Sequence, residues 1–129
     1  MAPQEPTVEE FLRRYAEPVR RIAHAARASI VGALPGCAET LDSKARVIGY
    51  GYGAGYADTV AVLIMSKTGV KLGIAYGSTL PDPKHLLQGK GRLHRHIPLT
   101  TTELIASRPV KAMLRNALLA YRTRRKAKP

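Results

Sequence analysis

The first forty residues place apolar side chains at the period of an α-helix. Thr7 and Glu10 have the capping-box spacing, and the apolar residues around them recur at helical intervals, which predicts a short helix. A proline is best tolerated in the first turn of a helix, and an apolar stripe recurs on one face after Pro18. The pattern therefore predicts a second helix over residues 18–31, ended by the sequence LPG at 34–36.

From residue 46 onward the period changes to that of β-strands. The segments TVAVLIMS (59–66) and VKLGIAY (70–76) are rich in β-branched and aliphatic residues. The short sequence KTG between them predicts a hairpin turn at Gly69. On each strand one set of alternate positions is expected to meet the helices: Val60, Val62 and Ile64 on the first, and Val70, Leu72 and Ile74 on the second.

The last third of the chain is predicted to hold a further strand and a final helix. Asp82 can cap a single helical turn through residues 83–86, and RLHRHIPL (92–99) reads as a strand. Ser107 and Pro109 open a helix that continues to Tyr121. The buried stripe of that helix is predicted to be Val110, Met113, Leu114, Ala117 and Tyr121.

These elements predict one α+β domain, with the N-terminal and C-terminal helices on one face of a curved antiparallel sheet. The domain is expected to span residues 7–121, behind a flexible N-terminus at 1–6. The sequence RTRRKAKP at 122–129 is strongly basic and is predicted to be a mobile tail. A length of 129 residues with 45% hydrophobic residues suits one packed core.

Composition narrows the environment in which the protein is expected to work. No uninterrupted apolar run approaches the roughly 18 residues of a membrane-spanning helix, so no membrane partner is expected. The first ten residues lack the basic and apolar segments of a secretory signal. Cys37 is the only cysteine, which excludes an internal disulfide. We therefore expect a cytoplasmic protein.

Charge is the most informative bulk property. The net charge is +12, and residues 44–129 hold sixteen of the lysines and arginines against three acids. Such a field attracts anions, acidic partners or nucleic acid. On the final helix and the tail, the candidate residues for weak, nonspecific nucleic-acid binding are Lys111, Arg115, Arg122, Arg124 and Arg125.

The sequence GKGRLHRH at 89–96 is the best candidate for a binding site. Glycine amides and nearby cations are the combination that binds phosphate or carboxylate. The candidate anion-binding residues are Gly89, Lys90, Gly91, Arg92, Arg95 and His96. The alternative interpretation is a solvated basic loop. His94 and His96 could ligate a metal with His85, but no carboxylate lies near them in sequence, so no metal site or cofactor is predicted.

The sequence IGYGYGAGYADT at 48–59 resembles a phosphate-binding loop only at first sight. Its glycines follow G-x-G-x-G-x-G, and the segment after them has the pattern of a strand, whereas a dinucleotide fingerprint is G-x-G-x-x-G followed by a helix. A structural bend with core or rim tyrosines is favoured over a ligand-facing wall. In the second case Tyr50 and Tyr52 are the candidate pocket wall.

No catalytic residues are predicted. The sequence GST at 77–79 lacks the elbow of a serine nucleophile, and Cys37 has no partner histidine that the sequence reveals. The acids are scattered without a paired-carboxylate motif.

The order of elements, together with LLQGKGRLHRH at 86–96, resembles the YdhG-like family of small, largely uncharacterised bacterial proteins. The resemblance spans about residues 7–121 and rests most on Leu86, Leu87, Gly89, Gly91, Arg95 and His96. It implies a frataxin-like fold. One branch of the family is described as iron chaperones, and this resemblance implies that carboxylate side chains would bind the iron. In this sequence the only clustered acids are Glu9, Glu10 and Glu17.

We therefore expect a noncatalytic binding protein for an anionic ligand or partner. An iron chaperone and a weak, nonspecific nucleic-acid-binding protein are the alternatives. Leu119 lies opposite the buried stripe of the final helix, which makes self-association a further hypothesis.

Overall fold

The computed structural model describes residues 5–127. Its helices are α1 (Val8–Leu12), α2 (Glu17–Ala33), α3 (Thr102–Ile105) and α4 (Arg108–Ala127). Its strands are β1 (Ala38–Asp42), β2 (Val47–Gly51), β3 (Thr59–Met65), β4 (Val70–Ile74) and β5 (Arg95–Leu99). Two single 3₁₀ turns, Tyr56–Asp58 and Gly77–Thr79, connect strands.

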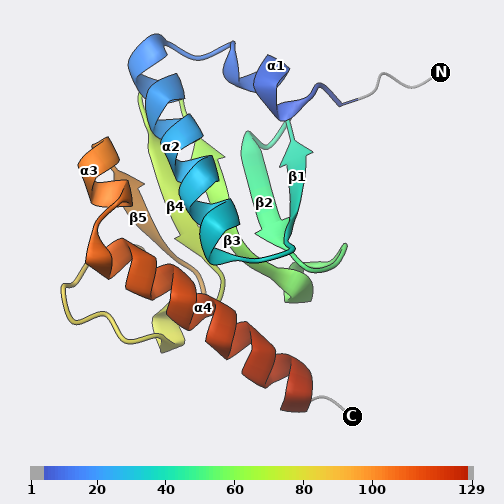
Figure 1. The fold of residues 1–129 in the computed structure, drawn as a ribbon, viewed down its shortest axis with the longest axis vertical. Coiled ribbons are helices and arrows are strands. Elements are labelled where there is room, and N and C mark those ends of the chain that lie inside the picture. The colour runs from blue at the N-terminus through green and yellow to red at the C-terminus, as the bar shows by residue number, and fades with distance from the viewer. Residues whose placement is uncertain (1–4, 128–129) are drawn as a thin grey trace.

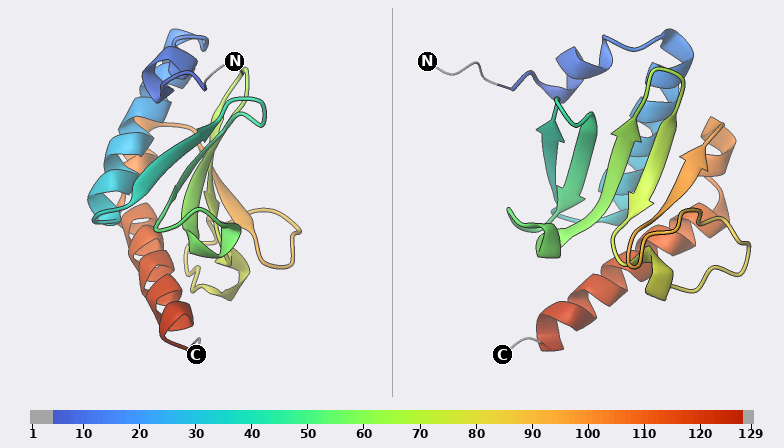
Figure 2. Two further views of the ribbon diagram at one scale, coloured as in Figure 1. Left: turned by 90° about the vertical axis from the view of Figure 1, so that its right-hand side faces the viewer. Right: turned by 180° about the vertical axis from the view of Figure 1, so that it is seen from behind.

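The strands form one antiparallel sheet in the order β1-β2-β3-β4-β5. Helices α2 and α4 lie on the same face of this sheet, and one hydrophobic core fills the space between the layers (Figure 1). Seen from the side, all the described helices lie on that face, which we call the inner face, and the outer face carries only loops at its end (Figure 2). The architecture is α+β with an antiparallel sheet.

The predicted helix starts agree with the structure. The Thr7 hydroxyl accepts a hydrogen bond from the Glu10 amide, and the Glu10 carboxylate accepts one from the Thr7 amide, each at 3.1 Å, which completes the capping box. Helix α2 has proline in its first turn and buries Val19, Ala23, Ala26 and Ile30. Within residues 5–127, no helix is long and apolar enough to cross a membrane.

Of the three β3 residues predicted to face the helices, the prediction is correct for Val60 and wrong for Val62 and Ile64. Ala61, Leu63 and Met65 pair with Ile74, Leu72 and Val70, and all six are buried. Val62 and Ile64 therefore lie on the outer face. The cause is a β-bulge, because Tyr50 pairs with Ala61 but Gly51 pairs with Thr59. Val60 is therefore an extra residue in β3, and both Val60 and Ala61 are buried.

In two segments of the C-terminal half, the structure differs from the prediction. The Asp82 carboxylate accepts hydrogen bonds from the amides of Leu86 and Leu87, but residues 83–86 are not helical: a turn covers 83–84, and His85 has a positive φ of 52°. Helix α4 continues to Ala127, so residues 122–127 are helical and the predicted tail is wrong there. Residues 1–4 of the predicted flexible N-terminus, and 128–129 of the tail, lie outside the described residues.

Candidate functional site

The candidate segment 89–96 divides into an exposed loop and a strand end. Gly89 takes a φ of 115°, and its neighbour Gln88 exchanges two backbone hydrogen bonds with His96, at 2.7 and 3.0 Å. The loop residues Lys90, Gly91 and Arg92 are exposed, while Arg95 and His96 begin β5 and are half-buried. The two groups of candidate residues therefore differ in exposure, and the second group lines a pocket.

A pocket of about 180 Å³ lies on the outer face of the sheet beside this strand end. We call it the outer-face pocket; it is lined by Tyr56, Thr59, Val62, Ile64, Gly73, Ile74, Ala75, His94, Arg95 and His96. Its floor is apolar and comes from β3 and β4. Gly73 keeps that floor open, because a Cβ there would lie 2.6 Å from the Cγ2 of Val62. His94, Arg95 and His96 complete the lining of the pocket.

One rim of the outer-face pocket is a tyrosine and histidine pair. The Tyr56 hydroxyl lies 2.7 Å from Nδ1 of His94, and the two ring centroids are 4.9 Å apart. Tyr56 is 51% exposed, so a ligand can reach it. This pair joins residues 38 positions apart. Only the folded chain brings them together, and for this reason the sequence did not reveal Tyr56 as a site residue.

The start of β5 also lines the pocket, with His96 paired to Gly73 and Arg95 paired to Ile74. The Arg95 guanidinium donates to the backbone oxygen of His94 at 3.0 Å. Burial, followed by the charge of Lys71, lowers the pKa of His96 below its ordinary value. The lowered pKa favours the neutral imidazole, which donates one hydrogen bond and accepts another.

The end of α4 lies against the loops at this end of the sheet. The Arg124 guanidinium lies 3.9 Å from the centroid of the Tyr76 ring, and the Tyr76 ring lies 6.5 Å from that of Tyr56. The Asp58 carboxylate accepts a hydrogen bond from Tyr121 at 2.7 Å and lies 3.6 Å from Arg125. Arg124 and Arg125 thus make contacts within the protein.

The remaining cations of α4 form a separate surface. Arg108, Lys111, Arg115, Arg122 and Lys126 are all exposed and recur every three, four or seven residues; we call them the basic row. Helix α4 contains no acid. Leu119, which lies within this row, is 50% exposed. Of the five candidate nucleic-acid residues, Lys111, Arg115 and Arg122 belong to the row.

The tyrosines proposed as a pocket wall do not line the outer-face pocket. Tyr50 is completely buried on the inner face, where its hydroxyl donates to Glu39 at 2.6 Å. Tyr52 stacks on Tyr121 with centroids 5.5 Å apart and donates to the Pro35 carbonyl at 3.0 Å. Tyr52 thus holds the start of the loop between β2 and β3 against α4, whereas Tyr50 belongs to the core side of the sheet.

Glu39 belongs to a polar cluster on the inner face that joins Glu9, Arg27 and Tyr50. It accepts two hydrogen bonds from Arg27, both at 2.9 Å, and Arg27 also donates to Glu9 at 2.7 Å. The hydrogen bonds from Arg27, followed by the one from Tyr50, lower the pKa of Glu39. Hydrogen bonding to Glu39 in turn raises the pKa of Arg27. Burial is the main cause that raises the pKa of Tyr50. The cluster ties α1 and α2 to β1 and β2.

The residues considered for metal binding or nucleophilic chemistry are placed apart. Glu10 caps α1, Glu9 pairs with Arg27, and Glu17 pairs with Arg21. Within residues 5–127, no group of three or more histidine, cysteine or carboxylate side chains could hold a metal ion. Burial raises the pKa of the Cys37 thiol, which disfavours the reactive thiolate.

Comparison with known proteins gives no match to this chain, whether with protein-family models, with curated proteins or with solved structures.

Proposed function

We propose that the protein binds a small anionic ligand in the outer-face pocket and carries out no chemistry on it. The observation that supports this most is the position of Arg95, His94 and His96 around an apolar floor. A guanidinium presents forked donors that match a carboxylate or phosphate. An apolar floor beside such donors favours a ligand that is part hydrocarbon and part anion.

The shape of the pocket narrows the ligand class. The floor consists of strand residues of a sheet, including Val62, Ile64 and Gly73, and the accessible ring of Tyr56 stands at its edge. A flat apolar surface and an aromatic edge favour a planar group. A volume of about 180 Å³ corresponds to about six water molecules in the liquid, so a small aromatic carboxylate is the best probe.

Benzoate is expected to bind the full chain and to lose about tenfold in affinity when Arg95 is replaced by alanine, since one charge-assisted hydrogen-bond pair is removed. The measurement is a benzoate titration followed by amide chemical shifts at Ile64, Gly73 and His96. Lys90→Ala is the matched control, because Lys90 lies in the exposed loop and does not line the pocket. Equal affinities of the Arg95 and Lys90 variants would reject the proposal.

We propose nucleic-acid backbone binding as a second candidate function, supported by the basic row. The row extends over 19 residues of helix, about 27 Å, and its members are exposed along that length. A row of cations with no acid on the same helix suits a chain of phosphates. The exposed Leu119 within the row leaves self-association as a related hypothesis.

The double variant Lys111→Ala and Arg115→Ala is expected to weaken binding of labelled single-stranded DNA and to reduce the slope of log affinity against log salt by about 1.4. Fluorescence anisotropy over a salt series measures this slope. A second double variant, Arg13→Ala and Arg14→Ala, removes the same charge from exposed positions after α1. An unchanged slope in the first double variant, or an equal change in both, would exclude a specific role of the row.

We also infer that the fold is frataxin-like and that the chain is related to the YdhG-like proteins. The order of a helix, antiparallel strands and a C-terminal helix supports this inference. The iron-chaperone alternative has less support, because Glu9, Glu10 and Glu17 are each engaged by a different partner. Anion binding therefore comes first among the candidate functions.

A further inference from the structure

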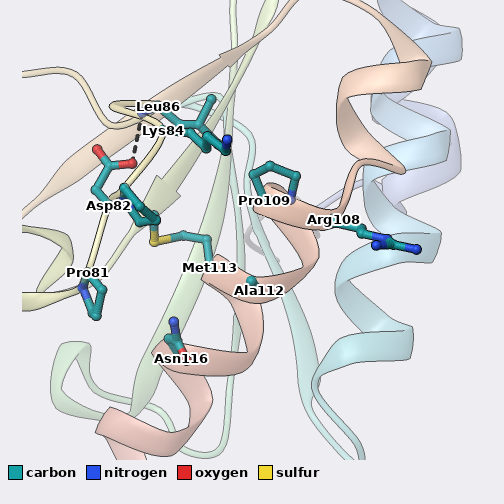
Figure 3. Close-up of a pocket in the computed structure, with 10 residues that line it drawn as sticks. Pro81, Asp82, Lys84, Leu86, Arg108, Pro109, Ala112, Met113 and Asn116 are labelled. Atoms are coloured by element: carbon teal, nitrogen blue, oxygen red, sulfur yellow. Dashed lines mark hydrogen bonds between the residues drawn. The ribbon is translucent and has the colours of Figure 1, made fainter.

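A second pocket lies between α4 and the loop that follows β4 (Figure 3). We call it the loop pocket; its volume is about 290 Å³ and its lining residues are Pro81, Asp82, Pro83, Lys84, Leu86, Arg108, Pro109, Ala112, Met113 and Asn116. Most of these side chains are apolar. None of them lines the outer-face pocket, so the two are separate sites.

The loop wall of this pocket is held in place without a ligand. The two carboxylate oxygens of Asp82 accept hydrogen bonds from the amides of Leu86 and Leu87, at 2.8 and 2.9 Å. The Asp82 carbonyl accepts another from His85 at 3.0 Å. The neighbouring residues Pro81 and Pro83 have fixed φ angles. A wall fixed in this way reduces the ordering that a ligand would otherwise have to impose.

Helix α4 supplies the opposite wall. The thioether of Met113 extends from the helix toward the loop that carries Asp82, with Ala112 beside it (Figure 3). Met113 is buried, whereas Ala112 is exposed and leaves open space next to the pocket. A flexible thioether and a small alanine form a surface that adapts to an alkyl chain.

The charge around the loop pocket is positive on balance. Figure 3 shows the Asp82 carboxylate turned to the loop amides, and the Arg108 guanidinium pointing away from the loop. Lys84 extends toward Pro109 in the first turn of α4, which is the positive end of the helix dipole. Within residues 5–127, no carboxylate lies within ion-pair distance of Lys84. An apolar pocket thus has one available cation at its mouth.

We propose that the loop pocket binds a medium-chain aliphatic carboxylate, with the alkyl chain against Leu86, Ala112 and Met113 and the carboxylate beside Lys84. A volume of about 290 Å³ corresponds to about ten water molecules in the liquid. A ligand of about ten non-hydrogen atoms fills that space, and octanoate has this size. This proposal does not depend on ligand binding at the outer-face pocket.

The test is a titration of octanoate, octanol and octylammonium into the full chain, below their micelle-forming concentrations, followed by the methyl resonances of Leu86, Ala112 and Met113. Octanoate is expected to give saturable shifts and to bind about fivefold more tightly than octanol. A fivefold gain in affinity is the most that a partly exposed ion pair typically contributes. Octylammonium is expected to bind most weakly. Lys84→Met retains the apolar stem and should reduce octanoate affinity to that of octanol.

Two further variants keep the test decisive. Ala112→Leu adds an alkyl group at an exposed helix position that tolerates leucine, and it should abolish binding of all three probes while circular dichroism remains unchanged. Arg122→Met removes one charge about 15 Å along α4 from Ala112, and it should leave the affinity for octanoate unchanged. No saturable shift, or equal affinities for octanoate and octanol, would overturn the proposal. So would ligand-free association of two chains through this loop, seen as a concentration-dependent mass.

Discussion

Replacing Glu39 with alanine is expected to lower the free energy of unfolding by about 3 kcal/mol, because the change leaves a partly buried arginine without its main acceptor. The side chains of Arg27 and Glu39 are only 21% and 23% exposed, so water replaces the lost bonds incompletely. The buried Tyr50 hydroxyl loses its acceptor as well. Urea denaturation measures this loss, and the melting temperature should fall by about 10 °C.

Two further variants separate the contributions within the cluster. Tyr50→Phe removes only the hydroxyl bond and should lower the unfolding free energy by about 1 kcal/mol. Glu9→Ala removes the exposed partner of Arg27 and should have a much smaller effect than Glu39→Ala, because surface ion pairs contribute little. A Glu39→Ala protein as stable as Glu9→Ala would show that the cluster does not hold the helices to the sheet.

The same cluster predicts how acid affects stability. Hydrogen bonds from Arg27 and Tyr50 lower the pKa of Glu39 in the folded protein, so the unfolded chain takes up the proton first as the pH falls. The contribution of Glu39 is therefore complete above its ordinary pKa of about 4.5 and declines as the pH falls toward the lowered value. Between these limits, stability should depend less on pH in Glu39→Gln than in the unchanged protein.

Local sequence patterns predicted the elements whose signals lie within a few residues. The capping box at Thr7 and Glu10 and the hairpin at Gly69 are examples, because each depends on contacts between near neighbours. The inner face of β3 was not predictable in this way. A single extra residue, Val60, shifts the alternation, and a bulge is visible only when both strands are paired.

The candidate site was predicted only in part for a similar reason. The residues 89–96 stood out through composition, but their division into an exposed loop and a pocket rim depends on the pairing of Gln88 with His96. The end of α4 was mistaken for a tail because charge alone suggests solvation. The helix persists there beside two partners from distant segments, Tyr76 for Arg124 and Asp58 for Arg125.

Replacing Gly51 with alanine is expected to destabilise the protein by about 2 to 3 kcal/mol, because a side chain there would overlap the backbone that follows it. A Cβ on Gly51 would clash with the Asp58 carbonyl oxygen and lie 2.8 Å from the Cα of Thr59. Backbone atoms cannot move aside as a flexible side chain can, and this carbonyl also accepts a hydrogen bond from Tyr52 at 2.8 Å. Urea denaturation of Gly51→Ala measures the loss.

Gly49 provides the matched control on the same strand and the same face. A Cβ on Gly49 would lie 3.8 Å from the Thr40 carbonyl oxygen, an ordinary contact, so Gly49→Ala should change stability by less than about 0.5 kcal/mol. Equal effects at the two positions would show that general strand propensity and not the close approach matters. If only Gly51 is sensitive, this glycine serves the tight return of the chain from β2 to β3, and this return leads to Tyr56 in the lining of the outer-face pocket.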